Sequence, residues 1–140
     1  MCALNVAKAQ TTRYALIADD DVELARALAE SLERDVGVKT VIAYKVSEAL
    51  MKLNNQRFDA VLLDLRFEHQ SGEQVLEHMR TEPTEKNRTT PVLVISGHID
   101  PVVLKRIVTK VQGILVKPFE KAAVIDKVKQ FLATRQPAAK

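Results

Sequence analysis

Short apolar runs alternate with longer amphipathic segments along most of the chain. Each run is three to five residues long, as expected for strands that are buried on both faces of a sheet. No run approaches the length needed to span a membrane. The runs predict strands at 14–18, 40–43, 60–63, 91–95 and 114–116.

The segments after the runs carry apolar residues at helical spacing, which predicts a helix after each strand. Asp20 or Asp21 can cap the first helix, and Gly37 closes it. The fourth helix opens with an N-cap and a proline, Asp100-Pro101, and the fifth runs from about Lys121 to Ala133. In the fourth helix we expect five apolar residues to face inward: Val103, Leu104, Ile107, Val108 and Val111.

Five strands that alternate with five helices predict a parallel sheet covered on both faces. Because crossovers are right-handed, few topologies remain, and the flavodoxin-like order 2-1-3-4-5 is the most common for five strands. We therefore expect an α/β, doubly wound (βα)5 sandwich at residues 14–133. A flexible N-terminal leader at 1–13 and a flexible C-terminal tail at 134–140 would flank it.

Polar residues stand where four of these strands end: Asp19-Asp20, Asp64, Ser96 and Lys117. In the expected order strands 1, 3, 4 and 5 are consecutive neighbours, about 4.8 Å apart. Their carboxyl ends would therefore bring these side chains into one small site. Asp64 is the centre of this site, because it directly follows an uninterrupted apolar run. A carboxylate at that position is poorly placed to pack in the core and well placed for chemistry.

Three carboxylates in one pocket repel one another unless a cation compensates their charge. The ligands are all oxygens, with no imidazole or thiolate cluster, which favours Mg²⁺ over zinc. Mg²⁺ often shares its site with a phosphoryl group, to which Ser96 can donate a hydrogen bond and Lys117 a positive charge. Since an aspartate is an established phosphoryl acceptor, the residues describe a carboxylate that is phosphorylated and read out.

Four motifs resemble the receiver domains of two-component response regulators: Leu16-Ile17-Ala18-Asp19-Asp20-Asp21, Leu62-Leu63-Asp64, Val94-Ile95-Ser96-Gly97 and Val116-Lys117-Pro118-Phe119. They occur in the family's order and close to its spacing over residues 14–133, and Gly72, eight residues after Asp64, also matches. The resemblance implies a stand-alone receiver in a two-component or phosphorelay signalling system. Its phosphoryl group would come from a histidine kinase or a histidine phosphotransfer protein.

The resemblance also implies roles for the acidic residues. Asp64 would be the phosphoacceptor and, with Asp20, would bind Mg²⁺ directly. Asp19 would bind the ion through water, and the backbone carbonyl of Arg66 would complete the protein ligands. Such a domain catalyses little beyond its own phosphorylation and dephosphorylation, so we do not expect a classical enzyme.

Two further residues would read the phosphoryl group. Ser96 would move to hydrogen-bond one phosphoryl oxygen, and Lys117 would pair with another. The resemblance also implies a cis Lys117-Pro118 bond.

The chain departs from the family pattern in three places. Phe67-Glu68 stands where the family usually has a proline, so the loop after Asp64 can sit differently. Ile114 occupies the switch position where an aromatic residue commonly swings inward. Arg66 and His98 occupy the two variable positions that influence phosphoryl lifetime, and we expect these bulky side chains to restrict water and slow hydrolysis.

Three other functions fit parts of the pattern. A pseudo-receiver scaffold would signal through protein contacts without phosphorylation, which the altered loop and Ile114 favour and the complete acidic set opposes. A phosphohydrolase with an aspartyl nucleophile generally needs an acid two residues later, where this chain has Arg66. A flavin-binding protein of this fold would need a phosphate loop after the first strand, where three aspartates stand instead.

Charge is distributed unevenly around the net +3. Residues 1–100 carry 12 lysines and arginines against 16 acids, whereas residues 101–140 carry 9 against 2. In receivers the face made by the fourth helix, fifth strand and fifth helix commonly meets a downstream partner or a second copy. An acidic protein partner and a merely solvated face are equally favoured, a homodimer is possible, and nucleic acid is disfavoured because no binding module follows. Five basic residues could form this partner face: Lys105, Arg106, Lys110, Lys121 and Lys127.

The N-terminal segment bears on the compartment. Cys2 is the only cysteine, which excludes an internal disulfide and indicates a reducing compartment. Residues 1–12 have no basic region ahead of an apolar core, so they do not form a secretory signal. We expect a soluble, cytoplasmic protein without membrane contact.

Overall fold

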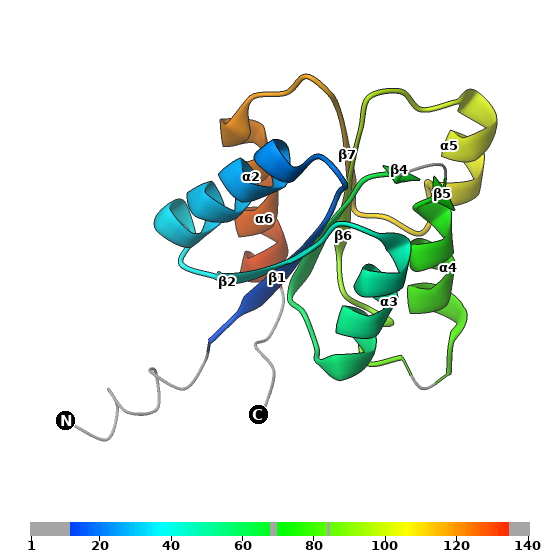
Figure 1. Ribbon diagram of the computed structural model, residues 1–140, viewed down its shortest axis with the longest axis horizontal. Helices are drawn as coiled ribbons and strands as arrows, with labels where there is room; N and C mark the ends of the chain where they lie inside the picture. Colours follow the sequence, from blue (N-terminus) through cyan, green and yellow to red (C-terminus); the bar gives the residue numbers. More distant parts are fainter. Residues whose placement is uncertain (1–11, 68–69, 84, 135–140) are drawn as a thin grey trace.

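The computed structural model describes residues 12–67, 70–83 and 85–134 (Figure 1). Five strands form one sheet: β1 (Tyr14–Ala18), β2 (Lys39–Ala43), β3 (Ala60–Leu63), β6 (Val92–Ser96) and β7 (Gly113–Val116). Two shorter strands form a hairpin: β4 (Arg66–Phe67) and β5 (Gln70–Ser71). The helices of the described chain are α2 (Val22–Asp35), α3 (Val46–Asn55), α4 (Glu73–Thr81), α5 (Pro101–Ile107) and α6 (Lys121–Ala133).

The sheet is parallel throughout, in the order β2-β1-β3-β6-β7. Counted along the chain, the five strands of this sheet have the predicted order 2-1-3-4-5. The other two strands, β4 and β5, form the separate hairpin, which was not predicted from the sequence. The flavodoxin-like α/β fold is therefore confirmed.

Helices cover both faces of the sheet, with α2 and α6 on one side and α3, α4 and α5 on the other (Figure 1). Successive side chains of a strand point to opposite faces, so each central strand supplies two cores. In β1, Leu16 and Ala18 belong to the core under α3 and α4, whereas Ala15 and Ile17 belong to the core under α2 and α6. This double burial explains why the strand sequences are continuous apolar runs.

Capping residues set three of the helix ends. Asp21 caps α2 by accepting a hydrogen bond from the backbone N of Leu24 at 3.1 Å. Gly37 closes the same helix with a φ of +85°, a conformation that favours glycine. Asp100 caps α5 by accepting from the backbone N of Val102 at 2.7 Å. These ends agree with the sequence predictions.

The inward face predicted for the fourth helix is partly wrong. Ile107 is buried and Val103 packs against the core, but Leu104 is 39% exposed and Val108 is 53% exposed. The helix ends at Ile107, and the turn that follows breaks the period on which the prediction rested. A seven-residue helix can present only one narrow stripe to the core.

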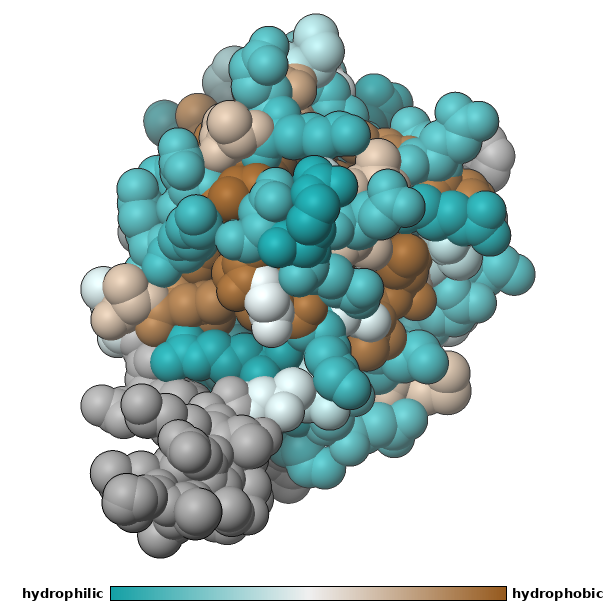
Figure 2. Space-filling model, turned by 90° about the vertical axis from the view of Figure 1, so that its left-hand side faces the viewer, coloured by the Kyte–Doolittle hydropathy of each residue, from teal (hydrophilic) through white to brown (hydrophobic). Residues whose placement is uncertain are grey.

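Large exposed apolar side chains concentrate in one part of the described surface. The α2 side, which faces the viewer in Figure 2, is mainly hydrophilic, with apolar side chains showing between the polar ones. Four of the six large exposed apolar residues instead lie on or beside α5 and β7: Val102, Leu104, Val108 and Val116. The apolar surface therefore gathers at the β7 edge of the sheet.

The two ends of the chain bear on the predicted domain limits. Of the predicted leader at 1–13, the structure describes only residues 12 and 13. Of the predicted tail at 134–140, it describes only Thr134. Arg13 donates from Nη1 to the carbonyl oxygen of Leu132 at 2.8 Å, which ties the start of the sheet to the last helix. In the described part of the chain, no helix has both the length and the apolar character to cross a membrane.

Candidate functional site

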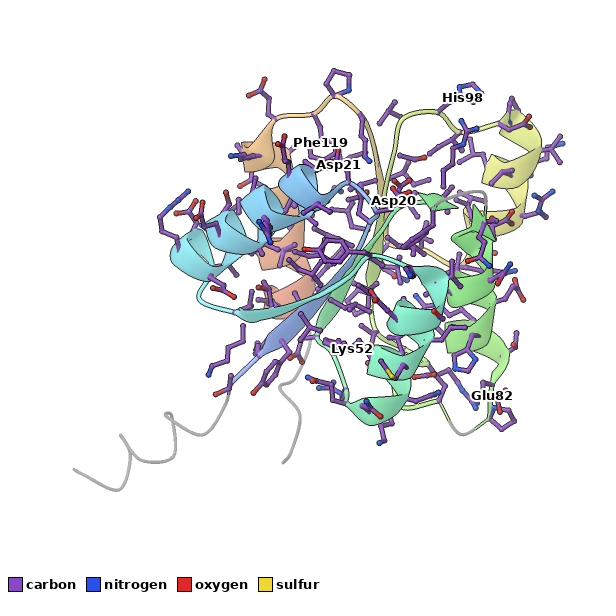
Figure 3. All side chains as sticks on the ribbon, in the orientation of Figure 1. Asp20, Asp21, Lys52, Glu82, His98 and Phe119 are labelled. Atoms are coloured by element: carbon purple, nitrogen blue, oxygen red, sulfur yellow. The ribbon has the colours of Figure 1, made fainter. Side chains whose placement is uncertain are left out.

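Three aspartates meet at the carboxyl ends of β1 and β3. One carboxylate oxygen from each of Asp19, Asp20 and Asp64 lies within 4.8 Å of the others. The backbone N of Asp64 donates to the carbonyl oxygen of Ala18 at 2.9 Å, which aligns the ends of the two strands. Asp20 lies at the same end of the molecule as His98, opposite the end that carries Lys52 and Glu82 (Figure 3).

Lys117 joins the acidic cluster from the end of β7. Its Nζ lies 3.0 Å from Oδ2 of Asp19 and 3.1 Å from Oδ2 of Asp64. Its backbone N donates to the carbonyl oxygen of Ser96 at 2.7 Å, and the Lys117-Pro118 bond is cis, as the resemblance implied. One lysine against three carboxylates leaves an excess of negative charge.

Burial and charge act in opposite directions on these groups. Burial raises the pKa of Asp19 above its usual value, although hydrogen bonds from the backbone of Asp21 and from Lys117 offset part of the shift. Burial lowers the pKa of Lys117, but its hydrogen bonds to Asp19 and Asp64 outweigh that effect and leave the pKa raised. Lys117 is therefore protonated at neutral pH and holds the two carboxylates together.

The donor set fits Mg²⁺. Asp19 is fully buried and Asp64 is 4% exposed, so two carboxyl groups lie close together away from water. Lys117 compensates one charge, and the remaining excess is an unfavourable arrangement that a small divalent cation would relieve. Carboxylate oxygens are the ligands that Mg²⁺ prefers.

The loop after Asp64 is fixed by backbone contacts. Oδ1 of Asp64 accepts from the backbone N of Arg66 at 3.0 Å, and the backbone N of Gly72 donates to the carbonyl oxygen of Leu65 at 2.8 Å. A Cβ on Gly72 would lie 2.1 Å from the backbone oxygen of Asp64, so only glycine allows this approach. The agreement of Gly72 with the family pattern thus has a steric cause. Phe67 and Glu68 are the residues at which the loop differs from the family pattern. Phe67 is fully buried, and Glu68 lies outside the described residues.

Ser96 is at the edge of the site but is not bonded to its carboxylates. The hydroxyl of Ser96 is buried and donates to the carbonyl oxygen of His98 at 3.3 Å. Ile114 is half-buried and packs in the core with Ile99 and Val103. Arg66 and His98 are both exposed.

The sequence did not predict two ion pairs between α4 and the segment of α5. Glu73 accepts from Arg106 at 2.8 and 2.9 Å, and Glu77 pairs with Lys110. Arg106 and Lys110, predicted for the partner face, are therefore engaged within the chain. The other three residues of that face have no ion pair within the described chain: Lys105, Lys121 and Lys127.

Comparisons with known proteins agree on one family. A model described as the response regulator receiver domain matches residues 15–129. The chain is 33% identical over 101 residues to the sensor histidine kinase AruS of Pseudomonas aeruginosa, covering 71% of this chain and 10% of that protein. It is 28% identical over 117 residues to the response regulator protein TodT of Pseudomonas putida, covering 83% of this chain and 49% of that protein. The chain thus spans from a tenth to about half of these relatives.

Solved structures show the same fold. A CheY-like receiver domain protein from Methanospirillum hungatei has a TM-score of 0.80 at 21% identity, covering 88% of this chain and 95% of that one. The receiver domain of the sensor histidine kinase PA1611 from Pseudomonas aeruginosa has a TM-score of 0.72 at 18% identity, covering 87% and 98%. That structure is described as having a magnesium ion coordinated in its active site cleft.

Proposed function

The chain belongs to the response regulator receiver domain family of two-component systems, and on that premise we propose that it is a Mg²⁺-dependent phosphoacceptor that switches a protein-interaction surface. Receiver domains are signalling domains rather than classical enzymes. The observation that supports the proposal is the convergence of Asp19, Asp20, Asp64 and Lys117 at one edge of the sheet.

Asp64 is the proposed phosphoacceptor. One carboxylate oxygen of Asp64 attacks the phosphorus of a phosphohistidine on a histidine kinase or phosphotransfer protein, and the P–N bond breaks as the O–P bond forms. The Nζ of Lys117 lies 3.1 Å from Oδ2 of Asp64, so it can form an ion pair with a phosphoryl oxygen once Asp64 is phosphorylated. Phosphorylation and slow self-dephosphorylation are the reactions that we assign to this site.

Four groups would hold the metal. Asp20 and Asp64 would ligate Mg²⁺ directly, Asp19 would act through water, and the carbonyl of Arg66 would be the fourth protein ligand. When bound, Mg²⁺ neutralises charge on the phosphoryl oxygens. The partly buried Lys117 bridges Asp19 and Asp64, which fixes these two carboxylates relative to each other.

Arg66 and His98 are the proposed modulators of phosphoryl lifetime. Both are exposed on the segments that follow Asp64 and Ser96. Their bulk would limit the access of water to the phosphoryl group, so Arg66→Ala and His98→Ala should both speed dephosphorylation. Unchanged rates would refute this role.

The proposed output surface lies at the β7 edge. Leu104, Val108 and Val116 supply exposed apolar area, and Lys105 and Lys121 are exposed cations on the flanking helices. Arg106 and Lys110 contribute charge but are held by α4. A homodimer through this face would bring like charges together, so an acidic protein partner is favoured over a second copy.

The proposal is tested by incubation with Mg²⁺ and acetyl phosphate, followed by intact mass measurement. Parent protein should gain one phosphoryl group, and Asp64→Ala should gain none. Asp21→Asn is a matched control, because this aspartate is exposed beside the site and asparagine also caps helices. Uptake by Asp64→Ala, or none by the parent with Mg²⁺ bound, would refute the proposal.

A pseudo-receiver scaffold is the second candidate. Ile114 supports it, because the chain lacks the aromatic half of the family's switch. A parent protein that neither binds Mg²⁺ nor gains mass, but still binds a partner through the β7 edge, would establish this function instead.

A further inference from the structure

A hollow of about 480 Å³ opens beside Asp64, between the β4–β5 hairpin and the start of α5. Leu65, Ile99 and Val103 give it an apolar lining. Its volume is in the range of small-molecule sites, about 300–1,000 Å³. The phosphoryl chemistry proposed above uses none of these three side chains.

The charged residues at the margin of the hollow differ in whether they already have partners within the chain. Both oxygens of Glu73 accept from Arg106, and Oδ1 of Asp100 caps α5. Arg66 uses its backbone N, but among residues 12–67, 70–83 and 85–134 no side chain forms an ion pair with its guanidinium. Glu73 is therefore compensated by Arg106, and Asp100 is exposed with one oxygen engaged as the α5 cap, so Arg66 is the cation of this margin that no ion pair engages within the described residues.

We propose that this hollow binds a small organic anion with an apolar body. The body would lie on Leu65, Ile99 and Val103, and the carboxylate would meet Arg66. A guanidinium matches a carboxylate with two parallel hydrogen bonds, which gives the site its preference for an anion. A neutral molecule of the same shape would gain only the apolar contact.

The position of the hollow connects it to the phosphoryl site. Leu65 directly follows Asp64, and Ile99 lies on the loop whose carbonyl at His98 holds the Ser96 hydroxyl. A bound ligand would bridge these two loops. Any effect on phosphoryl lifetime rests on the proposed function, whereas binding itself does not.

Binding is tested on the full chain without Mg²⁺ or phosphodonor, so its failure is distinct from failure of phosphorylation. The probes are 1-naphthoate and the neutral 1-naphthalenemethanol, titrated against backbone amide NMR spectra. Naphthoate should give saturable shifts centred on Leu65, Ile99 and Val103. The neutral alcohol should bind about fivefold more weakly, because it lacks the charge-assisted hydrogen bonds.

Two variants and one control locate the site. Arg66→Gln should weaken naphthoate to the level of the alcohol, and Val103→Phe should fill the hollow and weaken both probes. Lys105→Gln removes an exposed cation of α5 that does not line the hollow, and should change neither. Shifts centred on Val108 and Val116, no saturable shift, or unchanged binding in Arg66→Gln would each overturn the proposal.

Discussion

Replacing Gly72 by alanine is a sharp test of how the backbone builds the proposed phosphoryl site. The added Cβ would lie 2.1 Å from the backbone oxygen of Asp64 and 3.0 Å from Cα of Leu65. Because a Cβ essentially never approaches within 3.0 Å, the chain must move by roughly 1 Å, and no side-chain rotation can relieve a contact with backbone. The carbonyl that moves belongs to the proposed phosphoacceptor.

The expected cost follows from two opposing effects. Overpacking against rigid structure costs about 1–3 kcal/mol, and this clash belongs at the upper end. Gly72 has a φ of −65°, which alanine adopts freely, so the lower backbone entropy of the unfolded variant returns about 0.4–1 kcal/mol. We therefore expect Gly72→Ala to lower the free energy of unfolding by about 2 kcal/mol.

Urea unfolding followed by circular dichroism measures this change. Gly97→Ala is the matched control, since no atom lies within 4 Å of its added Cβ, and it should stay within about 0.5 kcal/mol of the parent. Phosphoryl uptake should slow in Gly72→Ala and not in the control. A Gly72→Ala variant as stable as the parent, or a control equally destabilised, would refute the steric argument.

Three further changes probe other parts of the chain. Asn87→Ala should lower the free energy of unfolding in urea by about 3 kcal/mol, because this fully buried side chain accepts a hydrogen bond from the backbone of Phe58 and donates to two carbonyl oxygens. Asn55 is exposed, so Asn55→Ala should change that free energy little. Lys117→Gln should lower the melting temperature without Mg²⁺, because it leaves two buried carboxylates uncompensated. Added Mg²⁺ should raise the melting temperature more in this variant than in the parent, and equal increases would contradict the reasoning. The hydrogen bond and charge of Arg106 hold the pKa of Glu73 below its usual 4.5, so the stabilisation is present above that pH and is lost as the pH falls through the lowered pKa. Glu73→Gln should therefore melt below the parent at neutral pH, and the difference should vanish on acidification; a difference that persists would contradict the ion pair's role.

The sheet and the acidic cluster were predictable because each rests on local pattern. Apolar runs of strand length, each followed by a helical period, permit few topologies, and those topologies place strand ends together. Asp19, Asp64 and Lys117 converge for that reason, although each residue alone would be weak evidence. The same logic located the caps at Asp21 and Asp100, whose partners lie two or three residues away.

Features that depend on tertiary partners were not predictable from pattern. The β4–β5 hairpin has no periodic signal, because each strand has two residues. The exposure of Leu104 and Val108 follows from the early end of α5, which the apolar spacing of the sequence does not show. The pairing of Arg106 with Glu73 joins residues 33 positions apart, and charge counts alone assigned Arg106 to a partner face.

The route of the signal out of the site can be argued from the same contacts. Ser96 donates to the carbonyl of His98, so a hydroxyl that turned toward a phosphoryl group on the proposed acceptor Asp64 would release the loop that leads to α5. Ile107 is the single buried residue of this helix, which is otherwise attached through half-buried contacts and one ion pair, Arg106 with Glu73 of α4. Ser96 also pairs with Val116 of β7, but that contact belongs to the sheet backbone, whereas the His98 loop leads directly to α5 and the apolar edge around Val108. We therefore expect phosphorylation to change α5 most, and β2, at the opposite edge of the sheet, least.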